Sequence, residues 1–330
     1  CRELGPRTPT GTAHPVYLFE VTHESGARNR FDVVSAAGLA PLVGRDREIG
    51  LLLDRWRQAQ EGLGHVALVG GEAGIGKSHL VWTLQQQVAH DARAWLTEWR
   101  CSPYHQNSAL YPIIEMLEAV VLEFGRHESP DEKLAKIEGF LVQYGFALEE
   151  SAPLLASLLS VPLGDAYAAM EAPPDEQKRK TVEIILTALL VRARFQPMLL
   201  VVEDLQWADA STVELLGMII DQAPTARMLA VFTYRPQFQP PWGGDPEIDH
   251  IALSRLLHDQ AVLIVNRLTG GKSMPAEVLA QIIAKTDGVP LFVEELVKTV
   301  LDSAVLREEG GEYRLDGPLL PVTIPSTLQD

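Results

Sequence analysis

Cysteine and long apolar runs are nearly absent from this sequence. The two cysteines, Cys1 and Cys101, lie far apart and in no metal-ligand spacing, which argues against a disulfide framework or a zinc site. We expect both to be reduced thiols, with Cys101 ending a buried strand. The longest apolar runs, such as residues 184–191 and 198–202, are far shorter than the ~18 residues that a membrane span needs.

Positive charge is also scarce. Lysine and arginine total 28 against 44 aspartates and glutamates, a net charge of −16. Binding to a phosphate backbone depends on clustered Lys and Arg, so this balance predicts no nucleic-acid partner. No signal peptide is visible. We therefore expect a cytoplasmic protein with no membrane partner.

The remaining composition is that of a globular protein. The 330 residues are 46% hydrophobic and 22% charged, and this length favours two or more packed units. The chain begins with Cys rather than Met, and residues 327–330 resemble the start of a helix. We interpret it as a fragment of a longer polypeptide.

Strand and helix patterns alternate through most of the chain. Since strands that alternate with helices imply right-handed crossovers, we predict an α/β fold with a parallel sheet flanked by helices. Residues 102–180 read as a helical insertion without a functional interpretation. Strands are expected at 15–21, 65–69, 92–100, 198–202, 228–233 and 248–253, and helices from 46 to about 62, at 110–124, 132–144, 153–159 and 175–195.

After about residue 256 the strand patterns stop. Helices are predicted at 258–268, 275–286 and 291–300, with Pro275 at a first helical position, and together they suggest a small helical lid domain. Ser211 and Glu214 have the spacing of a capping box for another helix. The predicted organisation is a remnant and linker at 1–36, a core at 37–256, the lid at 257–305, and the start of a truncated following domain at 306–330.

A glycine-rich loop lies between the strand at 65–69 and the helix that follows it. The loop is Gly71-Glu72-Ala73-Gly74-Ile75-Gly76-Lys77-Ser78, which has the spacing of a phosphate-binding P-loop in the required strand–loop–helix context. The glycines let backbone N–H groups turn toward phosphates, and the helix N-terminus adds a positive dipole end. We expect Lys77 to reach the β- and γ-phosphates of a nucleotide, and Ser78 to ligate Mg²⁺.

A second polar element follows the apolar run at 198–202. Glu203 and Asp204 end that strand, and a P-loop needs an acid at the end of a neighbouring strand to hold the metal. One acid would bind Mg²⁺ through water, and the other would orient or deprotonate the attacking water. By position Glu203 is the metal acid and Asp204 polarises water, although the reverse assignment stays open.

These motifs, with Val43-Gly44-Arg45-Asp46 and Trp207-Ala208-Asp209 in order around them, resemble the STAND class of signal-transducing, AAA-type P-loop ATPases. The resemblance covers about residues 40–305. It is closest to the ATPase region that follows the catalytic domain in bacterial class III adenylate and guanylate cyclases.

The resemblance implies roles for several further residues. Val43, Gly44 and Arg45 would line the adenine pocket, Arg235 would approach the γ-phosphate as a sensor, and Pro290 of a Gly-x-Pro element would pack on the adenine. His79 stands in the nucleotide-binding segment where the family usually carries Arg, and we expect a solvated helix position there.

Each of these residues also has a structural alternative. Arg235 could be a surface arginine, and Pro290 a first-turn proline. Trp207 is expected to pack in the core, and Asp209 could cap the following helix.

The N-terminal segment resembles the last strand of a class III cyclase domain, through residues 11–21. So short a remnant cannot hold that domain's catalytic residues, and this chain should not make cyclic nucleotide. The cofactors implied are ATP or ADP with Mg²⁺, and the partners are the covalently linked cyclase and C-terminal domains, such as helical repeats. A homo-oligomer stays open.

The function predicted is an ATP-binding, slowly ATP-hydrolysing regulatory module of a cyclase-type protein. Two alternatives stay open, which are a module that binds nucleotide without turnover and the ATPase part of a transcription regulator.

Overall fold

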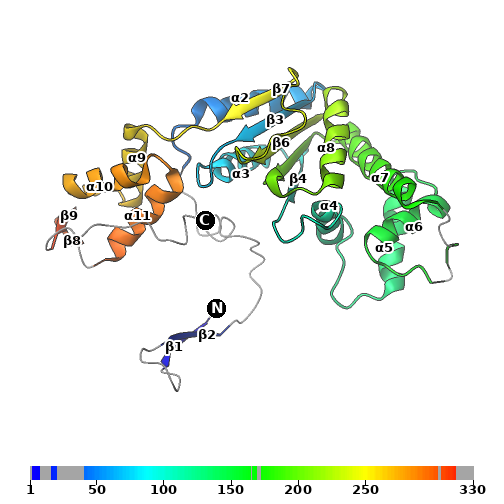
Figure 1. Ribbon diagram of the computed structural model, residues 1–330, viewed down its shortest axis with the longest axis horizontal. Helices are drawn as coiled ribbons and strands as arrows, with labels where there is room; N and C mark the ends of the chain where they lie inside the picture. Colours follow the sequence, from blue (N-terminus) through cyan, green and yellow to red (C-terminus); the bar gives the residue numbers. More distant parts are fainter. Residues whose placement is uncertain are drawn as a thin grey trace. The chain divides into compact units, whose positions relative to one another are not determined.

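The computed structural model describes residues 2–7, 16–20, 41–164, 166–168, 172–303 and 306–316. The chain divides into two compact units, Cys1–Pro41 and Leu42–Asp330, and Figure 1 labels most of their helices and strands. Cys1, the segment 8–15 and the expected helix start at 327–330 lie outside the described residues.

The described part of the first unit is an antiparallel pair of strands. Strand β2 (Val16–Glu20) confirms the strand predicted there. It pairs with β1 (Arg2–Arg7), and the register shifts between Glu3 and Gly5. Strand β1 was not among the strands predicted from the sequence; its segment is extended because it pairs with the nearby strand β2.

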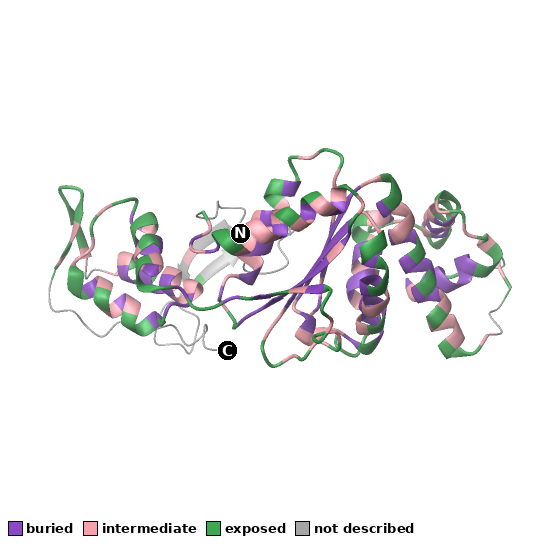
Figure 2. Cartoon of the chain, turned by 90° about the horizontal axis from the view of Figure 1, so that it is seen from above, coloured by how far each residue is buried: buried purple, intermediate pink, exposed green. Residues whose placement is uncertain are grey.

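The second unit is built on a five-stranded parallel sheet, which confirms the predicted fold class. Its three central strands are buried along most of their length (Figure 2), as continuous apolar runs in a parallel sheet should be, whereas the two edge strands are only partly buried. The strand order is β4-β5-β6-β3-β7, with bounds β3 (His65–Gly70), β4 (Trp95–Arg100), β5 (Met198–Glu203), β6 (Met228–Tyr234) and β7 (Ile248–Ala252).

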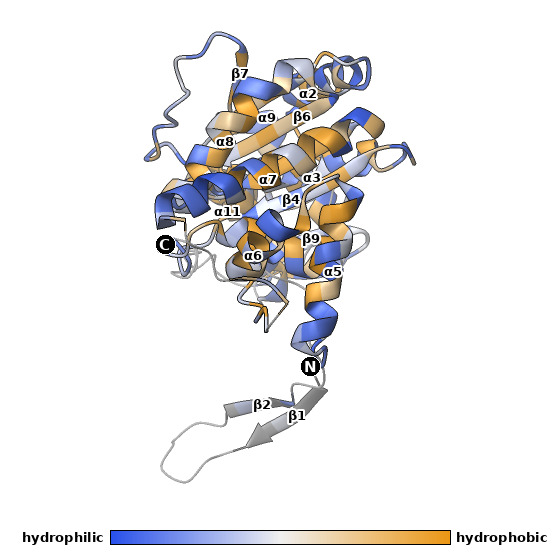
Figure 3. Cartoon of the chain, turned by 90° about the vertical axis from the view of Figure 1, so that its right-hand side faces the viewer, coloured by the Kyte–Doolittle hydropathy of each residue, from blue (hydrophilic) through white to orange (hydrophobic). Residues whose placement is uncertain are grey.

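Helices cover both faces of this sheet. On one face α2 (Asp46–Gln60) and α3 (Lys77–Val88) pack against alternate strand residues such as Val69 and Val231. On the other face α7 (Pro174–Phe195) and α8 (Ala210–Gln222) pack against the intervening residues, such as Leu68 and Phe232. Hydrophobic residues run along β6 and the helices around it (Figure 3). The period-two alternation of each strand thus feeds two separate cores.

The position of β5 differs from the expectation. The acidic strand was predicted to neighbour the P-loop strand, but β6 lies between β3 and β5 and pairs with both. The reason is long-range pairing, which the order of strands along a sequence does not determine. As a result the end of β6 lies between the P-loop and the two acids.

The insertion between β4 and β5 is helical, as predicted. It comprises α4 (Tyr111–Met116), a π-helical turn (Leu117–Val121), α5 (Pro130–Gln143) and α6 (Leu148–Leu158), and it leads into α7. These helices contribute to the same core as α7 and β4. No helix within the described residues is long and apolar enough to cross a membrane.

The lid consists of α9 (His258–Leu268), α10 (Ala276–Thr286) and α11 (Pro290–Asp302), which share a core of their own. Pro275 was predicted to be the first residue of its helix. It is instead the N-cap of α10, and the helix begins one residue later at Ala276. The strand patterns do not stop at 256, because β8 (Leu306–Glu309) and β9 (Glu312–Leu315) form a hairpin whose Leu306 and Leu315 pack on the lid core.

Helix α8 begins in a different way from the prediction. Its N-cap is Asp209, whose Oδ1 accepts the amide N–H groups of Ser211 (2.9 Å) and Thr212 (3.0 Å). The proposed capping box of Ser211 and Glu214 is wrong, because both residues lie inside the helix and Glu214 is exposed. An aspartate two residues earlier satisfies the orphan amide groups instead.

Candidate nucleotide site

The P-loop has the backbone that its glycines predict. Gly74 and Gly76 have φ angles of +74° and +99°, in the left-handed region that side chains disfavour. Gly76 is the N-cap of α3 and makes no side-chain cap hydrogen bond. Amide groups of the first turn of α3 are therefore available to an anion, where the helix dipole also favours negative charge.

Lys77 lies inside this loop, with 8% of its surface exposed. Its Nζ donates to the carbonyl oxygens of Gly71 (2.8 Å) and Glu72 (3.0 Å). Burial lowers the pKa of Lys77, and Arg235 lowers it further, whereas Asp204 and Glu203 raise it. The ammonium group thus lies among the acids and the arginine that were predicted to share its site.

Glu203, the first acid, is buried at the end of β5 with 5% of its surface exposed. Burial raises the pKa of this carboxyl to about 7, and the nearby Glu98 and Asp204 raise it too, while Arg100 and a hydrogen bond from Ser78 lower it. The contact with Ser78 brings together the two residues expected to hold the metal.

The donor set around Glu203 fits a magnesium ion. Oε1 of Glu203 is buried and has no hydrogen-bond partner among the described residues, so one carboxylate oxygen is available to a ligand. Mg²⁺ is usually held by one or two carboxylates, waters and substrate phosphates rather than by a full protein cage. Accordingly, no cluster of three or more His, Cys, Asp or Glu side chains able to bind a metal occurs in the described part of the chain.

Asp204, the second acid, has an unusual backbone. Its φ of +61° is in the left-handed region, a conformation that non-glycine residues keep only where surrounding contacts hold it. Its amide donates to Thr233 Oγ1 (3.0 Å), and its Oδ1 accepts Gln206 Nε2 (2.8 Å). Gln206 Oε1 in turn accepts the backbone N–H of Arg235 (3.1 Å). The ends of β5 and β6 are thus joined at the second acid.

The Val43–Arg45 segment contacts the lid through Val43, and it contacts the P-loop and the segment after β7 through Arg45. Val43 is buried in the lid core. Arg45 is 4% exposed, and its guanidinium donates to the carbonyl oxygens of Ile75 (3.4 Å) and Ser254. Burial lowers the pKa of Arg45. These contacts indicate that Arg45 positions the P-loop, whereas its proximity to an adenine base stays a prediction.

The lid is hydrogen-bonded directly to the P-loop. The amide of Leu291, in the first turn of α11, donates to the carbonyl oxygen of Gly74 (3.2 Å). Pro290 is the first residue of that helix. The preceding Gly288 has a φ of +73°, and a Cβ there would lie 2.4 Å from the Leu256 carbonyl oxygen. Only glycine allows this close approach, which sets the direction of α11.

An ion-pair triad that the sequence analysis missed joins the same elements. Arg255 pairs with Glu72 of the P-loop (2.8 Å) and with Asp287, the C-cap of α10. All three side chains are largely exposed, so solvent screens each pair. Arg255 lies two positions after the strand predicted at 248–253, and this position could have marked it as a candidate.

Arg100, at the end of β4, was also missed. Its Nε lies 3.4 Å from Glu203 Oε2, and it pairs with Glu98 as well. Since the carboxyl ends of parallel strands meet at one edge of a sheet, its place at a strand end was the available signal.

A cleft of about 600 Å³ lies between the P-loop and the lid. Its volume is within the range of small-molecule sites. The lining includes Glu72, Ala73 and Arg235, together with Arg255 and Val289, but not Val43, Arg45 or Pro290. The structure therefore brings Glu72 and Ala73 of the loop together with Arg235 at one cleft. Pro290 lies at the start of α11 beside it, and the lining does not include Lys77, Ser78, Glu203 or Asp204.

The other residues singled out have structural roles in the described chain. His79 is half-buried against Trp82, with Nε2 buried, so the expected solvated position is wrong. Trp207 packs on the core as expected. Asp209 is the cap of α8 and also accepts the Leu110 amide (3.2 Å). Cys101 is buried, and burial raises the pKa of its thiol to about 12.

The family model of the AAA ATPase domain matches residues 41–232 of this chain, which is more than half of it. The chain belongs to the AAA ATPase domain family. An uncharacterised protein of Rhizobium meliloti (strain 1021) is 25% identical over 302 residues, which are 90% of this chain and 28% of that protein. The chain thus spans 28% of the length of this curated relative.

Several solved structures share features of the fold. Cdc6p of Pyrobaculum aerophilum is 15% identical, with a TM-score of 0.46, over 82% of this chain and 64% of that one. The ORC1 protein of Aeropyrum pernix in complex with DNA is 12% identical, with a TM-score of 0.45, over 83% and 63%. Drosophila ORC bound to DNA is 11% identical, with a TM-score of 0.45, over 91% and 67%. Similarity at this level concerns the fold alone.

These structures correct one expectation. The acidic composition predicted that the chain has no nucleic-acid partner, but two of the proteins with a similar fold are bound to DNA. The exclusion was wrong because net charge is a sum over the whole chain and does not describe any local surface.

Proposed function

We propose that this AAA ATPase domain binds ATP with Mg²⁺ in the cleft between P-loop and lid, hydrolyses it slowly, and signals through the lid. The observation that carries the proposal is the hydrogen bond from the Leu291 amide to the Gly74 carbonyl oxygen. This bond links the phosphate-binding loop to the first turn of α11, so a movement of the loop is passed on to that helix. This is the coupling that nucleotide switches need.

The nucleotide would be held by groups that the loop already presents. The amides at the start of α3 and the ammonium of Lys77 would bind the phosphates. Lys77 would exchange its contacts with the Gly71 and Glu72 carbonyl oxygens for phosphate oxygens, which are stronger partners because they are charged. Arg235, which lies close enough to Lys77 to lower its pKa and lines the cleft beside Glu72 and Ala73, would stabilise charge on the terminal phosphate.

The two acids would divide the remaining work. Mg²⁺, when bound, neutralises phosphate charge and polarises the bond that breaks, and Ser78 and Glu203 would hold it. A nearby divalent cation favours the ionised form of Glu203, which offsets the effect of burial on its pKa. Asp204, fixed by Thr233 and Gln206, would orient the attacking water.

Lys77→Ala is the direct test of nucleotide binding. Mg-ATP at about 100 times its Kd should stabilise the wild-type chain by about 2.7 kcal/mol, and the variant should lose this stabilisation because the buried ammonium is gone. Thermal unfolding with and without Mg-ATP measures it. Lys133→Ala, which removes a lysine of the helical insertion, is the matched control. Equal stabilisation of Lys77→Ala and wild type would contradict nucleotide binding at this loop.

A second candidate function is nucleotide binding without turnover. The specific observation in its favour is the environment of Glu203, where burial and Glu98 oppose the charged form that a metal ligand needs. Steady-state phosphate release separates the two candidates. Release that depends on Lys77 and falls in Asp204→Asn supports hydrolysis, whereas release at background with intact ATP-dependent stabilisation supports a binding module.

The resemblance to cyclase-linked STAND ATPases supports a more specific proposal. The chain would be the regulatory part of a multidomain cyclase-type protein, with residues 1–36 belonging to a preceding cyclase-like domain and the lid passing the nucleotide state to its neighbours. Reading the parent gene on both sides tests this proposal, because a parent without a cyclase domain upstream would overturn it.

A further inference from the structure

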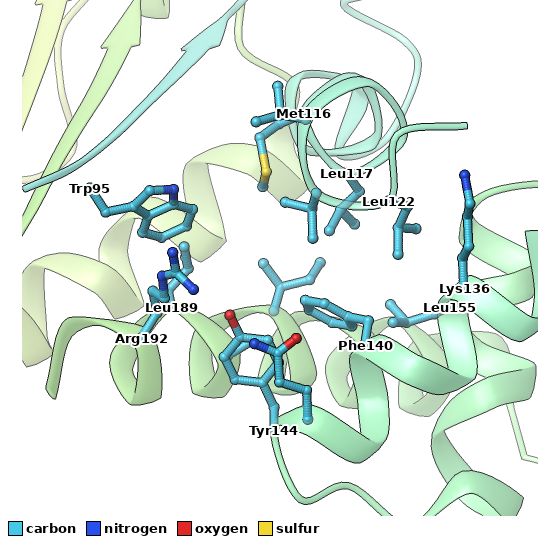
Figure 4. Close-up of a pocket in the computed structure, with 15 residues that line it drawn as sticks. Trp95, Met116, Leu117, Leu122, Lys136, Phe140, Tyr144, Leu155, Leu189 and Arg192 are labelled. Carbon is cyan, nitrogen blue, oxygen red and sulfur yellow. The ribbon is translucent and has the colours of Figure 1, made fainter. Parts of the chain in front are cut away.

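The helical insertion encloses a second pocket that the nucleotide site does not use. It has a volume of about 350 Å³ and lies between β4, the π-helical turn, α5 and α7. Figure 4 shows the side chains that line it. Most of them are apolar, including Leu117, Phe140 and Leu189. This size and lining are typical of small-molecule sites, in which a few polar groups fix the orientation of an apolar ligand.

The charge of the pocket is opposite to that of the chain. Lys136 and Arg192 contribute to the lining, and no aspartate or glutamate does, in a chain whose net charge is −16. Lys136 is neutralised by Glu128 (2.6 Å). For Arg192 no acidic partner occurs among the described residues, so its charge is the one that the pocket leaves available to a ligand.

The orientation of Arg192 suits an anion. Its guanidinium carbon lies 5.1 Å from the centre of the Trp95 ring. A cation–π contact of this kind uses no N–H group as a hydrogen-bond donor, so the guanidinium can still donate to an anion. One of them, Nε, is buried and bonded to no acceptor among the described residues. In Figure 4 the polar ends of Arg192 and Tyr144 lie close together at one end of the pocket.

We propose that this pocket, walled by Leu117, Phe140 and Leu189 and headed by Arg192 on Trp95, binds a small amphipathic anion, such as an aromatic or branched aliphatic carboxylate. The apolar body of the ligand fills the space between the helices, and its carboxylate accepts the N–H groups of Arg192. A planar carboxylate matches the guanidinium edge in a bidentate arrangement, which a point-like ammonium cannot provide.

The test uses 8-anilinonaphthalene-1-sulfonate, an aromatic anion whose fluorescence rises in apolar surroundings. It should bind the wild-type chain at one site. Arg192→Gln should weaken that binding about tenfold or more, since a hydrogen bond between charged groups is lost. Arg194→Gln makes the same charge change on the exposed side of α7, outside the pocket lining, and should leave binding unchanged.

A neutral probe and a second variant keep the result decisive. N-phenyl-1-naphthylamine lacks the sulfonate and should bind wild type and Arg192→Gln equally, which also shows that the variant is folded. Gln143→Glu places a negative charge at an exposed residue of the lining and should weaken binding of the sulfonate but not of the amine. Unchanged affinity for the sulfonate in both variants, or an equal loss in Arg194→Gln, would overturn the proposal.

Discussion

Among the carboxyl groups of the candidate nucleotide site, Glu203 has a strongly raised pKa. It is buried beside Glu98, and its pKa is about 7 because desolvation opposes the charged form. Arg100, at 3.4 Å, compensates only in part. Strongly shifted pKa values cluster at functional sites, where burial and neighbouring charges are arranged to adjust a group for its task.

The raised pKa of Glu203 predicts a pH dependence of stability. Between about pH 4.5 and 7 the folded chain holds a proton on Glu203 that the unfolded chain has already released. The contribution of Glu203 to stability therefore falls as pH rises through this window, by a few kcal/mol, and becomes level above it. In Glu203→Gln this contribution is absent, so the free energy of unfolding should fall less between pH 5 and 8 than in the wild type. Urea unfolding at several pH values measures the difference.

A control separates this effect from the general effect of removing a negative charge. Glu247→Gln makes the same change at an exposed loop residue, and its pH profile should run parallel to that of the wild type. Parallel profiles for wild type and Glu203→Gln would show that Glu203 titrates with its ordinary pKa.

Single residues differ in how far sequence alone can identify their contacts. The loop Gly71–Ser78 was predictable because its backbone demands are local: positive φ at Gly74 and Gly76, and a helix that starts at Lys77. The partners of Arg45 were not, because its guanidinium contacts the carbonyl oxygen of Ser254, 209 positions further along the chain. Sequence spacing carries no information about such a contact.

At the scale of elements, the start of α8 gives a clear test of the corrected cap. Asp209 is 7% exposed and accepts amide groups of α8 and of Leu110. Asp209→Ala should reduce the free energy of unfolding by about 2 kcal/mol, because helix caps contribute up to about that much and a further buried donor loses its partner. Urea unfolding checks this value.

Glu214→Ala is the matched comparison for α8. If a capping box of Ser211 and Glu214 started the helix, this change would be the costly one. Glu214 is exposed, and within the described part of the chain its ion pair is with Lys178 (2.7 Å), so we expect a change within about 0.5 kcal/mol. A larger loss in Glu214→Ala than in Asp209→Ala would restore the original assignment.

The turn between α10 and α11 depends on a close backbone approach. Gly288 and Gly270 both have positive φ, +73° and +64°, but a Cβ at Gly288 would lie 2.4 Å from a backbone oxygen, whereas at Gly270 nothing lies within 4 Å. Gly270→Ala should cost only the backbone strain, about 1 kcal/mol. Gly288→Ala should cost clearly more, since the turn must also move. Equal losses in urea unfolding would show that the turn relaxes without strain.

Elements also show where local patterns stop being informative. The bounds of α9 match the prediction because its apolar spacing is regular. Buried strands such as β5 can be predicted because they are continuous apolar runs. The hairpin β8–β9 was not predicted because its residues are mostly exposed and show little alternation of apolar and polar side chains. Its strands are held by each other and by the lid, neither of which a local pattern reveals.

At the scale of the whole domain, the order of the strands determines which residues lie next to one another at the candidate nucleotide site. With β6 between β3 and β5, Thr233 and Arg235 lie between the P-loop and the acids. The resemblance predicted Arg235 as a sensor, but local patterns could not say that its strand intervenes. Pairing between strands more than a hundred residues apart, such as β3 and β6, is a property of the folded sheet. It makes the P-loop, the two acids and Arg235 a single connected unit.

The last prediction follows from the contacts between this unit and the lid. Gly74 is bonded to Leu291, and Glu72 is paired with Arg255, which also pairs with Asp287. If nucleotide orders the P-loop, Mg-ATP should slow hydrogen exchange of amides in the first turn of α11 in the wild type. Arg255→Ala should reduce this protection while ATP still binds.

Lys298→Ala is the control for this prediction. It removes a lid cation whose ion-pair partner lies within its own helix, and it should leave the protection intact. Protection of α11 by Mg-ATP that is equal in all three proteins would show that the ion triad does not transmit the nucleotide state, and no protection in the wild type would separate the lid from the nucleotide altogether.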